Sequence, residues 1–516
     1  MNKIVEIIVS PDEVGDAHVI HQRACEKALV AAGDYQTFVL KSSIDARKRP
    51  IYRLQVQVQK EAIDPLDFIP ETYPLLPSDA PSVCIVGAGP AGLFAALKLI
   101  SKGIKPIILE RGKDVKARRF DLAKLTKQHI VDPQSNYCFG EGGAGTYSDG
   151  KLYTRSTKRG DVKSILRTLV QFGADRNILV NSHPHIGTNK LPQLIANMRE
   201  QIIACGGEVL FSTQWSGFDI KDNHIHRVFS ADGREWFPRA LILATGHSAR
   251  DVFEYLHDQQ IEVQFKSFAL GVRAEHPQTV IDQQQYHCAI RPEGLPPAAY
   301  GWVEQVEGRG VYSFCMCPGG IIAPCATAPG EVVTNGWSPS KRNNAWANSG
   351  IVVPIEWEDI SEFHHHGPLA GLRFQQSIEQ RCWKAGGSTQ AAPAQRLVDF
   401  IQNKKSRDLP SCSYIPGLVS VNLHEVLPSF IAQRLKRGFV QLGKKMKQYL
   451  HAEAVLVAPE SRTSSPVRIP RNPDNLQHPQ IHNLYPCGEG AGYAGGIISA
   501  AIDGERVAEA VYLSNA

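Results

Sequence analysis

The sequence predicts an α/β protein of several domains, and three patterns support this class. Residues 3–58 have the pattern strand, helix, strand, strand, and residues 83–109 have the pattern strand, helix, strand. Residues 484–514 have a strand, a glycine-rich turn and a helix. Helices that alternate with strands in this way cover the faces of a largely parallel sheet. At 516 residues the chain exceeds the roughly 100–200 residues of one domain, so we expect two or three.

The N-terminal pattern predicts a small α/β domain at residues 1–64. Its strands alternate apolar and polar residues and its helix has one apolar face, which gives four expected elements: Lys3–Val9, Ala17–Ala32, Thr37–Leu40 and Ile51–Val58. Five prolines follow between residues 65 and 81. Because proline fixes the backbone and lacks an N–H donor, we expect an extended, proline-rich linker at 65–80.

The remaining chain predicts a sheet domain that is interrupted by an insertion. Its first expected elements are Val83–Val86, Ala91–Lys102, Pro106–Leu109, Leu191–Cys205, Glu208–Phe211 and Ala240–Ala244. A long middle region of short strands, turns and irregular loops follows, and the last strand and helix complete the first sheet. We therefore predict a sheet domain from residues 81–265 and 459–516, with a substrate or cap domain inserted at 266–458.

Composition excludes several classes of protein. The 56 basic and 51 acidic residues give a formal charge of +5, which is far short of the charge of a nucleic-acid-binding protein. No stretch reaches the roughly 18 apolar residues of a membrane span, and no secretory cleavage pattern occurs near the start. The eleven scattered cysteines favour reduced thiols. We expect a cytoplasmic protein whose partner is a small-molecule substrate and not nucleic acid; the oligomeric state is not predicted.

A dinucleotide-binding fingerprint follows the first strand of the sheet domain. The segment 83–92, V-C-I-V-G-A-G-P-A-G, places G-x-G-x-x-G between a strand and a helix, the context that makes this motif informative. Gly87 permits the tight turn, Gly89 lets a pyrophosphate approach, and Gly92 allows close helix packing. The helix start, with Pro90 and Ala91, presents free N–H groups to the phosphates.

An acidic residue stands at the end of the next strand. Glu110 follows Gly87 by 23 positions, where a carboxylate can accept hydrogen bonds from the ribose hydroxyls of adenosine and disfavour a 2′-phosphate. The alternative is a glycine-rich turn in an α/β protein with Glu110 solvated. The combination of strand, helix and acid favours a dinucleotide site.

Three distant segments indicate that this dinucleotide is FAD. Segment 241–246, L-I-L-A-T-G, resembles the A-T-G segment of flavoproteins of the glutathione reductase type. Segment 484–490, L-Y-P-C-G-E-G, resembles their C-terminal flavin segment, where an acid at the position of Glu489 holds the flavin-side phosphate or ribityl region. Segment 139–151 is a glycine-rich loop whose amides can line an anionic cofactor, although alone it also fits a flexible surface turn.

A wider resemblance covers nearly the whole chain. Together with the 139–151 loop, segments 246–251, 271–277, 314–320 and 460–466 resemble bacterial FAD-dependent dehydrogenases of uncharacterised substrate. The resemblance implies a three-layer FAD/NAD(P)-binding (Rossmann-like) domain with an inserted mixed-sheet substrate domain and a small N-terminal α/β domain. The FAD contacts expected from matching positions, with Trp215 acting through its backbone on the adenine, are Gly87, Gly89, Pro90, Ala91, Gly92, Glu110, Arg111, Glu141, Gly142, Gly143, Ala144, Thr146, Ser148, Lys151, Trp215, Ala244, Thr245, Gly246, Gly488, Glu489, Gly496 and Ile497.

The sequence gives fewer indications of the chemistry beyond the cofactor. No second G-x-G-x-x-G occurs in the middle region, so we expect no dedicated NAD(P)H domain, although NAD(P)H can still act as a transient electron donor. Cys315 and Cys317 are candidates for a further redox group, but they lack the C-x-x-C spacing and structural thiols are favoured. No catalytic residue is assigned.

Other ionisable groups have structural alternatives that we favour. Arg273, His276 and His247 can orient a substrate or stabilise reduced flavin, but hydrogen bonding within the fold is the commoner role. The run His364–His366 fits a solvated loop better than a metal site, because adjacent side chains point apart. The basic segment Arg434–Lys447 fits a solvated helix face better than a surface for an anionic partner.

The leading hypothesis is an FAD-dependent oxidoreductase, a dehydrogenase or reductase of an unidentified small or lipophilic molecule. Three alternatives stay open: a flavoprotein that takes part in RNA modification, a non-catalytic regulatory protein that FAD stabilises, and a flavin monooxygenase. The sequence identifies neither the substrate nor the electron donor, because one fold hosts many chemistries.

Overall fold

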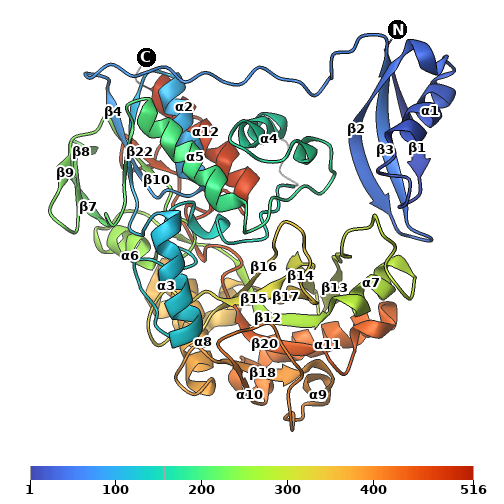
Figure 1. Cartoon of the computed structure of the whole chain (residues 1–516). Helices are drawn as coiled ribbons and strands as arrows, with labels where there is room; N and C mark the ends of the chain where they lie inside the picture. The colour runs from blue at the N-terminus through green and yellow to red at the C-terminus, as the bar shows by residue number, and fades with distance from the viewer. Residues whose placement is uncertain (1, 155–158, 515–516) are drawn as a thin grey trace.

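A computed structural model describes residues 2–154 and 159–514 of the chain (Figure 1). At its centre is a five-stranded parallel sheet in the order β22-β10-β4-β5-β6. The strands are β4 (Ser82–Val86), β5 (Lys105–Leu109), β6 (Glu208–Leu210), β10 (Ala240–Leu243) and β22 (Leu484–Pro486). The last strand comes from the C-terminal segment, as the sequence pattern predicts.

The sheet is the middle of three layers. Helices α2 (Pro90–Ser101), α5 (Leu191–Ala204) and α12 (Ile497–Leu513) cover one face, and the meander β7 (Trp215–Lys221), β8 (His224–Ser230) and β9 (Glu235–Trp236) covers the other with α6 (Arg250–Asp258) (Figure 1). The apolar residues of β4 alternate between the faces: Val83 and Ile85 pack under the helices, and Cys84 and Val86 under the meander. A strand buried on both faces reads as a continuous apolar run, which is why this segment is recognisable in the sequence.

A second, seven-stranded sheet lies beside the first, in the order β13-β14-β17-β12-β20-β18-β19. All its pairs are antiparallel except that of β18 with β19. Its strands are β12 (Phe268–Pro277), β13 (Val303–Val306), β14 (Arg309–Cys317), β17 (Trp346–Ile355), β18 (Ala392–Arg396), β19 (Leu418–Ser420) and β20 (Val455–Glu460). Helices α7 (Gln278–Tyr286), α8 (Ala370–Ala385), α9 (Leu397–Gln402), α10 (Leu423–Val426) and α11 (Ser429–Lys445) flank it.

The expectation of short strands in this middle region holds for β13, β18 and β19, but not for the long strands β12, β14 and β17. β12 and β17 each have ten residues, and every residue of β12 except Pro277 is buried. Burial on both faces removes the alternation that signals a strand, and charged residues such as Arg273 and Glu275 interrupt the apolar run. β20 extends to Glu460, two positions beyond the predicted end of the insertion at 458.

The N-terminal unit contains β1 (Lys3–Val9), α1 (Ala17–Ala28), β2 (Gln36–Asp45) and β3 (Ile51–Gln59), in an antiparallel sheet of order β1-β3-β2. The helix ends earlier than expected because Leu29 adopts a left-handed conformation with φ of 58°. Figure 1 shows this unit at one end of the molecule, joined by the extended segment that precedes β4. Its buried residues share one hydrophobic cluster with the second sheet, and the Tyr52 hydroxyl donates to the Gly294 carbonyl at 2.7 Å.

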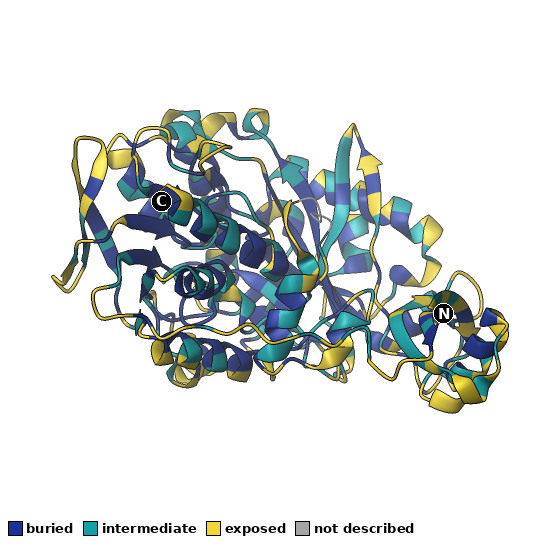
Figure 2. Cartoon of the chain, turned by 90° about the horizontal axis from the view of Figure 1, so that it is seen from above, coloured by how far each residue is buried: buried dark blue, intermediate teal, exposed yellow. Residues whose placement is uncertain are grey.

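The remaining elements connect these units. They are α3 (Val115–Gln128), α4 (Val162–Gln171), the strand pairs β11 (Gln264–Phe265) with β21 (Val467–Arg468) and β15 (Ile321–Pro324) with β16 (Thr334–Trp337), and short 3₁₀ helices including η2 (Gly143–Gly145), η4 (Arg176–Leu179) and η5 (Trp357–Leu369). Figure 2 shows a buried interior that runs through both sheets, with exposed residues on the outer helices and loops. Among the described residues, no helix has the length and apolar character that crossing a membrane requires.

Candidate functional site

The fingerprint turn lies between β4 and α2, where the parallel strands end. Gly87 has a φ of +105°, and a Cβ there would lie 2.5 Å from the Ala244 carbonyl oxygen. A Cβ on Gly92 would clash with the carbonyl oxygen of Gly87. Gly89, the N-cap of α2, differs: no atom lies within 4 Å of the position its Cβ would take. Two of the glycines are thus required by packing, and the third leaves room for a ligand at a helix N-terminus.

The glycine-rich loop meets this turn. A Cβ on Gly143 would lie 3.3 Å from the Gly89 Cα, and one on Gly145 would lie 3.4 Å from Ile497 and 3.6 Å from Pro90. The Gly142 amide donates to the Ala88 carbonyl at 2.8 Å. The loop therefore lies against the starts of both α2 and α12.

The two other predicted segments also lie here. A Cβ on Gly488 would lie 3.0 Å from the Ala91 Cβ, and one on Gly490 would clash with the Gly246 carbonyl. The Thr245 hydroxyl is buried and has no hydrogen-bond partner within the described part of the chain. An unpaired buried hydroxyl costs free energy, so this atom fits a site that a polar ligand completes. All four segments chosen from the sequence converge, and their donors suit a diphosphate.

Glu110 is buried, and its carboxylate accepts three backbone amides. One oxygen accepts from Ala88 at 2.9 Å, and the other accepts from Gly112 and Gly140, each at 2.9 Å. The acid thus ties the fingerprint turn to the glycine-rich loop. A carboxylate has about four acceptor positions, so one remains for the ribose contact that the sequence predicts.

The loop contains further polar residues that were expected to contact FAD, and their side chains also bond within the protein. Glu141 is buried and accepts from the Val115 amide at 2.8 Å, and its other oxygen is 3.4 Å from Arg199. Thr146 donates to the Glu141 carbonyl at 2.7 Å, and Ser148 donates to the Gly145 carbonyl at 2.7 Å. These side chains fix the loop shape, and Ala144 lies at its exposed tip.

Sequence reasoning missed the residue that holds this loop most directly. Arg118 of α3 is fully buried, and its guanidinium donates to the backbone carbonyls of residues 136, 137, 141 and 143 at 2.7–2.9 Å. A signal was available: Arg118 is on the helix face of Val115, Leu122 and Leu125, which are buried. An arginine within an apolar stripe indicates a buried, fully bonded guanidinium.

Arg111 and Trp215 are the residues that the sequence predicts at the adenine end of the site. The Arg111 guanidinium pairs with Asp251 and lies 4.5 Å from the centre of the Phe139 ring. Trp215 opens β7 and packs edge-on against Tyr255, with ring centres 5.0 Å apart. Its backbone contact to adenine remains a prediction.

Glu489 and Lys151 are residues that the sequence predicts at the flavin end of the site. Burial raises the pKa of Glu489 to about 7. The positive charge of Lys266 opposes this increase, and the negative charge of Cys315 adds to it. The Lys151 ammonium donates to the Met316 carbonyl in the second sheet, so the glycine-rich loop reaches across to that sheet. Gly496, with Ile497 after it, caps the start of α12.

A cavity opens between the glycine-rich loop and the β15–β16 pair. The residues of the first domain that line it are Tyr137, Cys138, Ala144, Tyr147, Ser148 and His247. The inserted region and the segment that follows it contribute Ala323, Cys325, Val333, Thr334, Asn335, Gly336, Trp337, Glu460 and Arg462. Aromatic rings and a few polar groups line it, as in small-molecule sites, but its free volume of about 30 Å³ means that its walls must move to admit a substrate.

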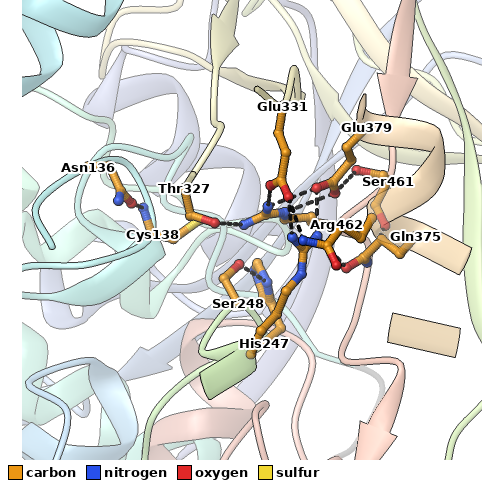
Figure 3. A network of polar contacts seen from close by, with 12 residues as sticks. Asn136, Cys138, His247, Ser248, Thr327, Glu331, Gln375, Glu379, Ser461 and Arg462 are labelled. Carbon is orange, nitrogen blue, oxygen red and sulfur yellow. Dashed lines mark hydrogen bonds and ion pairs between the residues drawn. The ribbon is translucent and has the colours of Figure 1, made fainter. Parts of the chain in front are cut away.

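Arg462 of the cavity wall belongs to a cluster of four charges, of which Glu331, Glu379 and Arg462 are buried and Arg250 is half-buried (Figure 3). Arg250 pairs with Glu331 at 2.7 Å and with Glu379 at 2.6 Å, and Arg462 pairs with the same acids at 3.3 and 2.9 Å. Burial lowers the pKa of His247 to about 4, and the Arg462 charge adds to this. His247 is therefore neutral near pH 7, and its ring contacts the Ser248 hydroxyl at 2.8 Å.

The other candidates bond within the fold. Arg273 pairs with Glu460 at 2.7 Å, His276 contacts the Tyr449 carbonyl at 2.8 Å, and His364 stacks on Trp357 at 4.0 Å. Several charges of α11 are paired, including Lys445 with Glu304 at 2.5 Å. Within residues 2–154 and 159–514, no group of His, Cys, Asp and Glu side chains is arranged to hold a metal ion. All eleven cysteines are free.

Comparison with known proteins identifies related sequences across the chain. Family models match residues 267–463 as an FAD-dependent protein, C-terminal domain-like, residues 81–143 as an FAD binding domain, and residues 1–59 as a domain of unknown function. An uncharacterized protein of Clostridium beijerinckii is 39% identical over 528 residues, which cover 98% of each chain.

Similar solved structures include a glycine oxidase from Bacillus cereus and CtdE in complex with FAD. The first has 12% identity and a TM-score of 0.32, and the match covers 86% of this chain and 96% of the oxidase. The second has 14% identity and a TM-score of 0.33, with 84% of each chain covered. At such scores the likeness supports no functional conclusion, and the inference of FAD rests on the family models and on the site.

Proposed function

The chain belongs to the same family as the uncharacterized Clostridium beijerinckii protein, and two FAD-related family models match it. On this premise we propose that it is a dehydrogenase or reductase of a small molecule. FAD supplies the hydride or electron transfer, as in other flavoproteins. The observation that carries the proposal is the cavity, which borders both the glycine-rich loop of the FAD site and the inserted region. A substrate there would lie beside the cofactor.

The residues of the chain have distinct tasks in this proposal. Arg118 and Glu110 hold the loop that carries the cofactor, through carbonyl and amide hydrogen bonds. His247, neutral near pH 7, is a hydrogen-bond partner for an uncharged polar group of the substrate. Tyr147 anchors the loop by donating to the Val115 carbonyl at 2.8 Å.

The unit built on the seven-stranded sheet is the proposed substrate domain. It contributes Thr334, Asn335 and Trp337 to the cavity. The fingerprint at Gly87 is assigned to FAD, and the middle region has no second one. We therefore propose that NAD(P)H binds only transiently, as the electron donor to the flavin. The eleven free thiols favour a reducing compartment such as the cytoplasm.

Anaerobic titration of the FAD-loaded protein with NADH and NADPH tests the proposal. We expect the flavin colour to bleach with one of them and to return when an electron-accepting substrate is added. The His247→Asn variant is expected to retain FAD and to be reoxidised by the substrate about tenfold more slowly, the effect of one lost hydrogen bond.

Oxygen consumption in the same assay separates a dehydrogenase from a monooxygenase. Uptake of oxygen in proportion to product would favour the monooxygenase. Flavin that no donor, including dithionite, reduces would contradict an oxidoreductase and favour a structural role of FAD.

A further inference from the structure

The end of β14 has an irregular backbone where it faces the FAD site. The pairing of β14 with β17 shifts register between Phe314 and Cys317. Within this bulge Cys315 has a φ of 47°, a left-handed conformation that a non-glycine residue rarely adopts. Such positions need support from their surroundings and are concentrated at functional sites.

Two cations from different elements support this segment. Lys151 of the glycine-rich loop donates to the Met316 carbonyl, and Arg273 of β12 donates to the Cys315 carbonyl at 3.2 Å. The Cys317 thiol donates to the same carbonyl at 3.3 Å, so its side chain turns back toward residue 315. The two cysteines are two positions apart, on either side of the Met316 carbonyl that Lys151 contacts.

The charges around the pair favour one thiolate and one thiol. The hydrogen bond from Cys317 lowers the pKa of Cys315 to about 5 against burial, with help from Lys151 and Arg273. The same hydrogen bond and burial raise the pKa of Cys317 well above its usual value. Asp149, Glu460 and Glu489 are the acids that face the pair, and Arg342 pairs with Asp149 at 2.6 Å.

The pair also borders the flavin end of the site. Lys151 belongs to the loop assigned to FAD, and its ammonium donates to the Met316 carbonyl between the two cysteines. Cys315 keeps part of its surface accessible, whereas Met316 and Cys317 are buried.

We propose that Cys315 and Cys317 form a redox-active dithiol that exchanges two electrons with FAD. In the forward direction an Sγ–Sγ bond forms, the proton of the Cys317 thiol is released, and two electrons pass from the sulfurs to FAD. FAD takes up these electrons and one proton and becomes the anionic reduced form, so atoms and charge balance. The proposal depends on bound FAD and not on the identity of the substrate.

Anaerobic reduction of the oxidised holoprotein with dithionite tests the dithiol. We expect about four electrons per FAD in the wild type, two for the flavin and two for a disulfide, and about two in Cys315→Ser and Cys317→Ser. Cys288→Ser, a similarly half-buried cysteine outside the site, should still take up about four. Uptake of only two electrons by the wild type would overturn the proposal.

Alkylation and absorbance give readouts that do not depend on turnover. In the oxidised wild type, iodoacetamide should label neither Cys315 nor Cys317 unless the protein is reduced, and their peptide should be lighter by two hydrogen atoms. With the dithiol reduced and FAD oxidised, the thiolate should give a long-wavelength band that disappears in Cys315→Ser and as the pH falls below about 5. Full labelling of both cysteines in the oxidised protein would contradict the proposal even if the serine variants failed to fold.

Discussion

Arg118 shows at the residue scale how the site depends on groups that never touch the chemistry. Its guanidinium is the donor to the carbonyls of residues 136, 137, 141 and 143, all in or beside the loop assigned to FAD. Removing it takes the side-chain donor from the carbonyls of Asn136 and Tyr137, whereas those of Glu141 and Gly143 keep a hydrogen bond from Thr146. Each carbonyl left unsatisfied costs about 1–3 kcal/mol.

Arg118→Met should therefore weaken FAD binding at least about tenfold and lower the melting temperature, since the loop loses its shape. Lys124→Met is the control, because this side chain of the same helix is exposed. Fluorescence titration of the apoprotein with FAD measures both variants. Equal affinities for FAD would show that Arg118 does not organise the site.

His276 gives a pH-dependent prediction. It is fully buried, and burial lowers the pKa of its ring to about 4, below the ordinary value of 6.5. Between pH 4 and pH 6.5 this histidine is protonated in the unfolded chain but not in the folded protein. Its contribution to the free energy of unfolding is therefore complete above about pH 6.5 and is lost as the pH falls toward 4. The size is about 3 kcal/mol at most.

Urea unfolding of the wild type and His276→Gln at pH 7.5 and pH 5 checks this. The loss of stability between the two pH values should be smaller in the variant. The same loss in both proteins would assign the pH dependence to other groups.

The sequence could predict only part of the site at this scale. The glycines at 87, 89 and 92 and the acid at 110 follow from a motif whose spacing reflects a fixed strand-turn-helix geometry. Arg118 was missed because charge alone indicates the surface. Cys315 could be named but its role could not, because its conformation depends on a register shift between strands far apart in sequence.

At the scale of elements, the contact between α6 and α8 depends on the buried charges of Figure 3. Arg250 comes from α6 and Glu379 from α8, and both acids of the cluster bind both arginines. A buried pair costs desolvation when it forms, but removing one partner leaves an uncompensated charge.

Glu379→Gln should therefore destabilise the protein by about 3–5 kcal/mol. Asp219→Asn, which breaks an exposed pair with Arg227, should change stability by less than about 1 kcal/mol. Denaturant midpoints of the two variants make the comparison. If Glu379→Gln were as mild as the surface variant, the cluster would not hold the two helices together.

Elements were predictable where their pattern is local. β4, α2, β5 and α5 begin and end within one residue of the ranges expected from periodicity. β2 is longer than expected because its residues are only half-buried, and the length of β12 and β17 was missed because both of their faces are buried. Tertiary burial decides these cases, and a local window does not contain it.

At the scale of the whole molecule, four segments far apart in sequence surround one site, and the insertion supplies the opposite wall of the cavity. The central claim is that these segments converge on FAD. Gly89 and Gly33 both have open space where a Cβ would be, but only Gly89 lies at the predicted phosphate position.

The most direct test is the flavin absorbance of the purified wild type, Gly89→Val and Gly33→Val, each after incubation with FAD and removal of the excess. The wild type and Gly33→Val should retain about one FAD per chain, and Gly89→Val should fold but remain colourless, because its side chain would fill the space of the pyrophosphate. A wild-type protein that takes up no FAD, or a Gly89→Val variant as yellow as the wild type, would contradict the claim.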